Sequence, residues 1–219
     1  MLDRGEFIRR LRAVPANAAS LRAERKRISR QVAALNRTVV LALAHHLLDA
    51  RIPRFVAYEL ILNHKPTMES IHRAEVERLG RGMDHWGDVD SFACFIAGPA
   101  WRAGRILDDV IRAWARSDEW RWRRAALVST VPLNSRARGG AGDAKRTLAI
   151  CSMLTTDRHD LVVKALSWAL RELAKRDPES VRRFLLAHGD GLAGRVIREV
   201  NNKLDAGRKN PRRPRASMA

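Results

Sequence analysis

Short segments with apolar residues at helical spacing follow one another along almost the whole chain, and Gly and Pro lie mainly between them. Alternating β-branched runs and Asn-Gly or Asp-Gly hairpin turns are almost absent, so we expect few or no strands. Proline suits the first turn of a helix, because the N–H that it lacks has no partner there. Expected helix starts of this kind are Pro53, Pro66, Pro99 and Pro178. The sequence therefore predicts an all-α fold.

About ten to twelve short helices with tight connections are expected. Residues 1–35 should form one or two charged helices, and Pro99 should restart the chain after Gly98. Acidic residues near several predicted helix starts agree with the helix dipole. The remaining predicted helices cover 38–50, 53–63, 66–79, 88–97, 108–116, 118–130, 143–155, 158–176, 178–188 and 191–205.

An internal echo favours stacked helix pairs. The segment Arg124-Ala125-Ala126-Leu127 is repeated as Lys164-Ala165-Leu166 about 40 residues later, which is the period of HEAT-like repeats. Ordinary helical packing can produce the same echo. A stack of such repeats curves and offers a concave face. We therefore expect residues 1–205 to form a single HEAT-like helical-repeat superhelix (an α-solenoid) with a concave basic face.

Two basic segments differ from the rest. Residues 206–219 lack hydrophobic side chains to pack, so we expect a disordered tail. Residues 131–146 form a Gly-rich loop that either contacts phosphates or serves as a mobile, solvated linker. Asp143 is expected to cap the helix that follows. The cations of this loop that could contact a DNA backbone are Arg136, Arg138, Lys145 and Arg146.

The net charge of the chain limits the classes of partner that it is expected to bind. Its 42 Lys and Arg against 24 Asp and Glu give a net charge of +18, which favours a polyanion such as duplex DNA, RNA or an acidic membrane. A soluble basic protein with an Arg-rich composition is the plain alternative. No basic amphipathic helix with an aromatic apolar face is evident, so a membrane partner is not expected.

The cysteines and histidines show no metal-binding pattern. Cys94 and Cys151 lie in no zinc-ligand spacing, and the adjacent His45 and His46 point to different faces of a helix. We therefore expect neither a metal nor another cofactor. Two lone thiols fit a reducing cytoplasm, and we expect a monomer there, associated with the nucleoid.

The segment Asp84-His85-Trp86-Gly87-Asp88-Val89-Asp90 concentrates three carboxylates in a chain rich in arginine. Phosphate repels a carboxylate on a DNA-facing surface, so such a group is expected to have a task. It can stabilise a developing positive charge or orient a water molecule. Helix capping is the simpler reading, and we favour it for Asp88. Asp90, two residues further on, is the better candidate for chemistry.

Tryptophan is unusually frequent, with six residues against one Tyr. Most buried Trp side chains belong to a core, but a Trp face also attracts cations. An alkylated purine carries a positive charge. Trp rings beside one carboxylate would suit recognition of such a base.

Three blocks resemble the AlkD-type DNA alkylation-repair glycosylases, over about residues 38–205. They are Trp86-x-x-Val89-Asp90, Arg123-Arg124-Ala125-Ala126-Leu127, and Lys164-Ala165-x-x-Trp168-Ala169-Leu170-Arg171-Glu172, in the order of that family. The resemblance implies HEAT-like repeats and excision of positively charged N3- and N7-alkylpurines from duplex DNA, without flipping the base into a pocket. The chain departs from the pattern at Gly87, where the family often has Asp, and in the loop 131–146.

The resemblance also implies roles for individual residues. Asp90 matches the catalytic aspartate, and Trp86 and Trp168 match aromatics that contact the lesion nucleotide. Arg124 matches an arginine that contacts DNA, and Arg123 and Arg171 are further candidates for the DNA backbone. Whether Asp88 shares the catalytic role is left open. The alternative reading is a non-catalytic HEAT-repeat protein that binds nucleic acid or serves as a scaffold.

Overall fold

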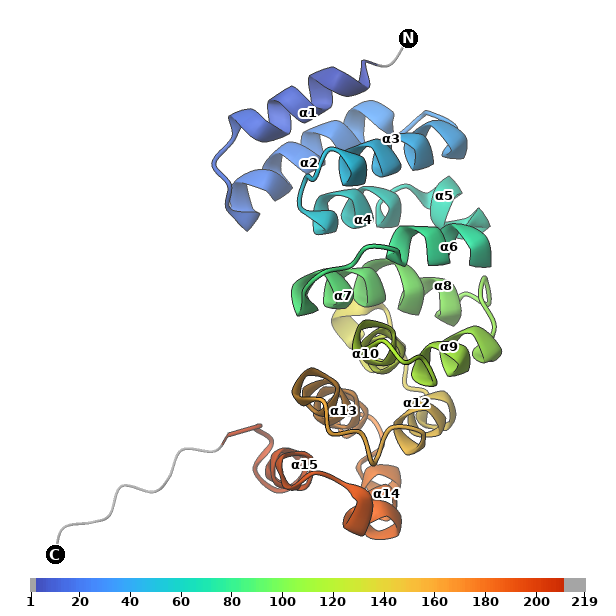
Figure 1. Ribbon diagram of the computed structural model, residues 1–219, viewed down its shortest axis with the longest axis vertical. Coiled ribbons are helices and arrows are strands. Elements are labelled where there is room, and N and C mark those ends of the chain that lie inside the picture. Colours follow the sequence, from blue (N-terminus) through green and yellow to red (C-terminus); the bar gives the residue numbers. More distant parts are fainter. Residues whose placement is uncertain (1–2, 211–219) are drawn as a thin grey trace, which may run out of the picture. The chain divides into compact units, whose positions relative to one another are not determined.

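The computed structural model describes residues 3–210 and contains no strand in that range, so the predicted all-α helical-repeat class is confirmed (Figure 1). The chain divides into two compact units, residues 1–110 and 111–219. Each unit consists of short helices that pack on their neighbours in sequence. The single domain over 1–205 and its concave basic face stay predictions.

The first unit is built around α4 (Arg54–Leu62), which packs against α2, α3 and α7. Its large, fully buried side chains include Tyr58, Phe92 and Trp101. The other elements are α1 (Arg4–Ala13), α2 (Ala18–Val32), α3 (Arg37–Asp49), α5 (Lys65–Ser70), α6 (Arg73–Gly80), α7 (Trp86–Phe92), a π-helix (Ala93–Ala97), α8 (Gly98–Arg102) and the start of α9 (Asp108–Ala115).

The boundaries predicted near residues 71 and 99 are wrong. The helix expected over 66–79 is two helices, because Ile71 is extended and the backbone N–H of His72 donates to Glu75 Oε2 (3.2 Å), which starts α6. Pro99 does not begin a separate helix after a break at Gly98. The π-helix carries α7 directly into α8, and the N–H of Gly98 bonds the carbonyl of Ala93, so the proline enters a helix whose register has already shifted.

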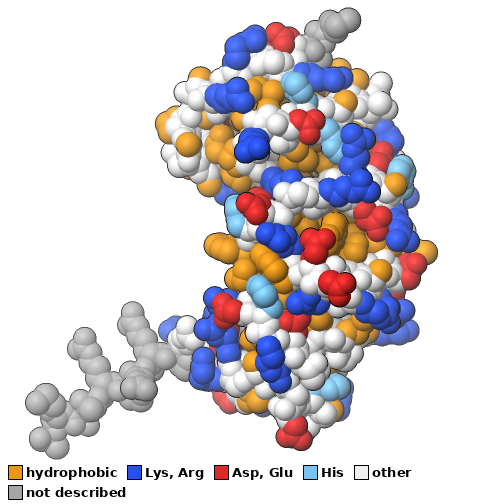
Figure 2. Space-filling model, in the orientation of Figure 1, with side chains coloured by type: hydrophobic (Ala, Val, Ile, Leu, Met, Phe, Trp, Pro, Cys, Tyr) orange, Lys and Arg blue, Asp and Glu red, His pale blue; other side chains and the backbone are white. Residues whose placement is uncertain are grey.

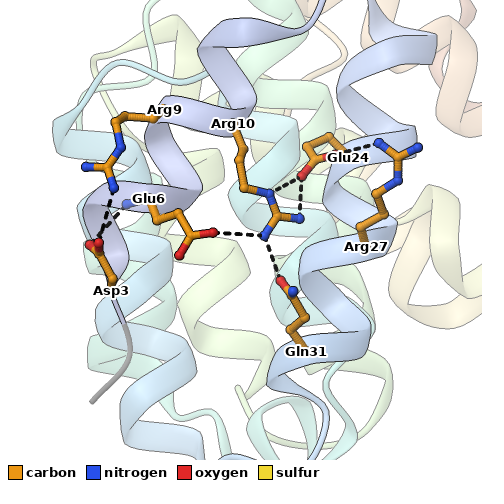
Figure 3. Close-up of polar contacts among 7 residues, drawn as sticks. All are labelled: Asp3, Glu6, Arg9, Arg10, Glu24, Arg27 and Gln31. Atoms are coloured by element: carbon orange, nitrogen blue, oxygen red, sulfur yellow. Dashed lines mark hydrogen bonds and ion pairs between the residues drawn. The ribbon is translucent and has the colours of Figure 1, made fainter.

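A buried carboxylate joins α1 to α2 (Figure 3). Glu24 accepts from Arg10 Nε (2.7 Å) and from Arg27 Nη1 (2.9 Å), and Arg10 also donates to Gln31 (2.9 Å). Burial alone would raise the pKa of Glu24, but the two guanidinium groups outweigh it and hold that pKa below the ordinary value. Some of the basic residues of the N-terminal helices therefore form ion pairs that hold these helices together.

We predict that Glu24→Gln lowers the free energy of unfolding by about 2 kcal/mol at pH 7, because two charge-assisted hydrogen bonds are weakened at a buried site. The stabilisation by Glu24 is complete above the ordinary carboxyl pKa and is lost as the pH falls through the lower folded-state pKa. Urea unfolding should therefore show a gap between the two proteins at pH 7 that closes in acid. A gap independent of pH would contradict the assignment.

The second unit is centred on α13 (Asp160–Leu173), which packs against α10, α12 and α15. The apolar side of α13 is almost completely buried, with Ala165, Ala169 and Leu170 among its fully enclosed residues. The other elements are α10 (Trp120–Val128), α11 (Val131–Asn134), a 3₁₀ turn (Arg136–Arg138), α12 (Ala144–Ser152), α14 (Pro178–His188), a second 3₁₀ turn (Gly189–Gly191) and α15 (Gly194–Ala206).

The segment 131–146 is ordered, which contradicts the mobile linker. Arg176 donates to the carbonyls of Asn134 (2.8 Å) and Gly140 (2.6 Å), which ties the segment to the end of α13. Gly140 is required there, because a Cβ would lie 2.5 Å from the carbonyl oxygen of Pro132. Asp143 caps α12 as predicted, accepting from the N–H of Arg146 (2.9 Å).

The start of the predicted disordered tail is also folded. Helix α15 runs to Ala206, and Gly207 ends it in the left-handed conformation (φ 68°). Lys209 Nζ then lies 3.3 Å from Glu199, and its carbonyl accepts from Asn202 (3.0 Å), so residues 207–210 lie against α15. The prediction of disorder is therefore wrong for 206–210, and its remainder, 211–219, lies outside the described residues.

Candidate functional site

Helix α7 begins at Trp86, two residues earlier than the sequence predicts. Its cap is His85, whose Nδ1 accepts from the N–H of Gly87 (3.0 Å). A Cβ at position 87 would lie 2.9 Å from the His85 ring, so Gly87 fits this cap. The capping role expected for Asp88 thus belongs to His85, which the sequence analysis missed because His is an uncommon cap. The cap leaves the Trp86 side chain 56% exposed.

Asp88 is engaged in holding the start of α7 in place. Its Oδ2 accepts from the N–H of Asp84 (3.2 Å) and lies 3.8 Å from Arg54 Nε, and its Oδ1 lies 3.5 Å from His85 Nε2. Its side chain is only 16% exposed. These contacts give Asp88 a structural role.

Asp90 lies one turn after Trp86 on the same face of α7, since residues four apart in a helix are neighbours. It is partly exposed, so it does not lie in the helical core, and the adjacent Val89 is fully buried. The structure thus places one indole and one carboxylate one turn apart on α7, both accessible to solvent.

Arg54 fixes the chain that leads into α7, and no local sequence signal marked it. It donates to the hydroxyl of Tyr58 (2.9 Å) and to the carbonyls of Leu79 (3.3 Å) and Arg81 (2.8 Å). Burial raises the pKa of Tyr58 to about 12, so its hydroxyl keeps its proton and donates to Leu79 (2.9 Å). Together with its ion pair to Asp88, Arg54 connects α4, the turn after α6 and α7.

Trp168 lies on α13 in the second unit and is partly exposed. The neighbouring Ser167 and Arg171 face inward instead. Ser167 donates to the buried Glu199 of α15 (2.6 Å), and Arg171 Nε donates to Ser167 (3.1 Å). Burial lowers the pKa of Arg171. The candidate Arg171 is therefore mostly engaged between α13 and α15.

Arg124 and Arg123, both on α10, also make packing contacts. Arg124 is 5% exposed and donates to the carbonyl of Leu161, which joins α10 to the start of α13. Arg123 pairs with Asp157 (2.6 Å) and donates to the carbonyls of Ser117 (2.9 Å) and Asp118 (2.7 Å). Their predicted contacts with DNA remain untested.

The ordered segment 131–146 carries its cations near solvent. Arg136 and Lys145 are exposed, and Arg138 and Arg146 are partly exposed. Arg146 lies 3.7 Å from Asp143. Lys and Arg side chains are scattered over the face drawn in Figure 2, with Asp and Glu among them. A phosphate backbone is the natural partner for such cations.

Within residues 3–210, no group of three His, Cys, Asp or Glu side chains is arranged to hold a metal ion. Cys94 and Cys151 are both buried free thiols, and burial raises the pKa of Cys151. None of the described helices combines the length and the hydropathy needed to cross a membrane.

Comparison with known families agrees with these features. A family model described as DNA alkylation repair enzyme matches residues 16–204, which cover most of each unit and include every predicted site residue. A search among curated proteins finds no match to the chain.

Proposed function

Because the chain belongs to the DNA alkylation repair enzyme family, we propose that it hydrolyses the N-glycosidic bond of cationic N3- and N7-alkylpurines in duplex DNA. Its activity would be that of a DNA-3-methyladenine/7-methylguanine-type glycosylase. The observation that carries this proposal is the pair of Trp86 and Asp90, one turn apart on α7 and both accessible to solvent.

The chemistry needs one well-placed negative charge. Alkylation at N3 or N7 makes the purine a good leaving group, because it departs as a neutral base with the electrons of its bond to C1′. The sugar is left as an oxocarbenium-like cation, which the ionised Asp90 stabilises. A water molecule then adds to C1′ and gives up a proton, which leaves an abasic site. No general acid is required.

The indole rings would contribute in two ways. Their faces attract cations, and their bulk shields the developing charge from solvent. We propose that Trp86 and Trp168 both contact the lesion nucleotide. Arg124 is almost fully buried, so we infer that it acts mainly by fixing α13, the helix of Trp168, with any DNA contact secondary.

Among the proposed backbone contacts, Arg136 and Lys145 have the strongest support, since both are exposed on an ordered segment. Each phosphate contact adds about 0.9 to the slope of log affinity against log salt concentration. We therefore predict that Arg136→Gln with Lys145→Gln weakens duplex binding and reduces this slope by about 2. The measurement is fluorescence anisotropy of a labelled duplex at several salt concentrations.

The control is Lys65→Gln with Arg73→Gln, which removes two exposed cations that pair with Glu69 and Glu77 within their own helices. This control should keep the wild-type slope. An equal change in both double variants would show that net charge alone matters.

The assay that tests the proposed function is release of 7-methylguanine from methylated duplex DNA. We expect wild-type protein to release the base well above the spontaneous rate. Tight binding to DNA without release would favour the non-catalytic alternative, a HEAT-repeat protein that binds nucleic acid or serves as a scaffold.

A further inference from the structure

A cleft in the first unit lies between α1, α3 and α6, and no residue of α7 lines it. Its volume is about 530 Å³, within the range of small-molecule pockets. The polar side chains that line it come from all three helices and are mostly cationic or imidazole groups: Arg4, Arg37, His45, His46, Asp49 and Arg78. We call this feature the α1/α3/α6 cleft.

The charge of the cleft is positive. Glu75, which also lines it, is bound by Arg37 and lies 3.4 Å from His72 Nε2, so its negative charge is compensated. Arg4 and Arg78 have no ion-pair partner within the part of the chain that the structure describes. Two guanidinium groups therefore line the cleft without an ion pair, and Asp49 is the other carboxylate that lines it.

Further donors surround the same space. Arg37 Nε is buried without a hydrogen-bond partner, the kind of donor that a ligand or water molecule satisfies. Burial and the nearby charge of Arg78 lower the pKa of His45, so at neutral pH this ring is uncharged and supplies a hydrogen bond. The arginines are permanent cations of the cleft, and their guanidinium groups suit the oxygens of phosphate.

We propose that the α1/α3/α6 cleft is a binding site for a phosphate group, separate from the proposed catalytic face on α7. Arg4 from α1 and Arg78 from α6 bind the phosphate oxygens from two sides, and Arg37 from α3 lines the floor. The phosphate group belongs either to a small phosphorylated molecule or to a strand of nucleic acid that passes over this part of the unit.

The first arm of the test is isothermal titration of the full chain with inorganic pyrophosphate. We expect saturable binding near one site per chain, weakened at least tenfold by Arg4→Gln with Arg78→Gln. The control is Arg9→Gln with Arg73→Gln, which removes the same charge from the same two helices outside the cleft and should leave binding unchanged.

The second arm measures the affinity of an undamaged labelled duplex for the same three proteins. If DNA supplies the phosphate, pyrophosphate binds weakly or not at all, and the cleft variant loses at least threefold more duplex affinity than the control. Equal behaviour of the two double variants in both arms would overturn the proposal. Neither arm depends on excision, so the cleft and the proposed glycosylase activity succeed or fail separately.

Discussion

Replacing Asp90 by Asn should reduce the rate of 7-methylguanine excision by about a hundredfold or more, which corresponds to about 3 kcal/mol of transition-state stabilisation. Asn has the same shape and keeps the partly exposed position on α7, but it lacks the charge that the oxocarbenium-like sugar requires. Because ground-state binding depends mainly on phosphates, the affinity for undamaged duplex should change little. Single-turnover excision at saturating enzyme measures this effect.

Asp88→Asn is the matched control, since it makes the same change two residues away. Asp88 is held by the N–H of Asp84 and by Arg54, so we expect its loss to lower stability while most of the excision rate is kept. Equal losses of rate in the two variants would contradict the assignment of Asp90. A larger loss of excision rate in Asp88→Asn than in Asp90→Asn would show that Asp88 is the catalytic carboxylate.

Replacing Arg54 by Met should lower the free energy of unfolding by about 3 kcal/mol, because it removes charge-assisted hydrogen bonds and leaves Asp88 partly buried without its cation. Met preserves much of the apolar stem, so lost packing contributes little. The Arg54 side chain is 18% exposed, bonds the carbonyl of Arg81 and shares the carbonyl of Leu79 with the hydroxyl of Tyr58. Urea unfolding followed by circular dichroism measures the change.

Arg73→Met is the control for this prediction. Arg73 is 56% exposed and forms one ion pair with Glu77 within α6, so its removal should cost less than about 1 kcal/mol. If both variants lose similar stability, Arg54 is not the anchor of the start of α7.

The sequence predicts the fold well where the signal is local. Pro178 at the start of α14, Asp143 before α12 and the apolar spacing of α13 are all read within a few residues. The errors arise where residues distant in sequence determine the local structure. The segment 131–146 looks like a linker until Arg176, on the far side of α12 and α13 in sequence, bonds its carbonyls. The helix continues past Pro99 because the π-helix Ala93–Ala97 precedes it, and no local residue pattern predicts that π-helix.

The candidate site divides in the same way. The spacing of Trp86 and Asp90 is visible in the sequence, because positions four apart share a helix face. Whether a basic residue is buried cannot be read from the sequence. Arg123, Arg124 and Arg171 could equally face DNA or the protein, and their partners Asp157, Leu161 and Ser167 lie on other turns or helices. Local periodicity places a side chain on a face but does not identify what covers that face.

The most direct test of the central claim is binding of a duplex that carries a cationic 1-aza-deoxyribose in place of the damaged nucleotide, compared with a neutral tetrahydrofuran site. A protein that stabilises the charged sugar should bind the cationic duplex more than tenfold more tightly, in the manner of a transition-state analogue. This preference should disappear in Asp90→Asn. If wild type shows no preference, or if the preference survives in Asp90→Asn, then Asp90 does not stabilise the sugar cation.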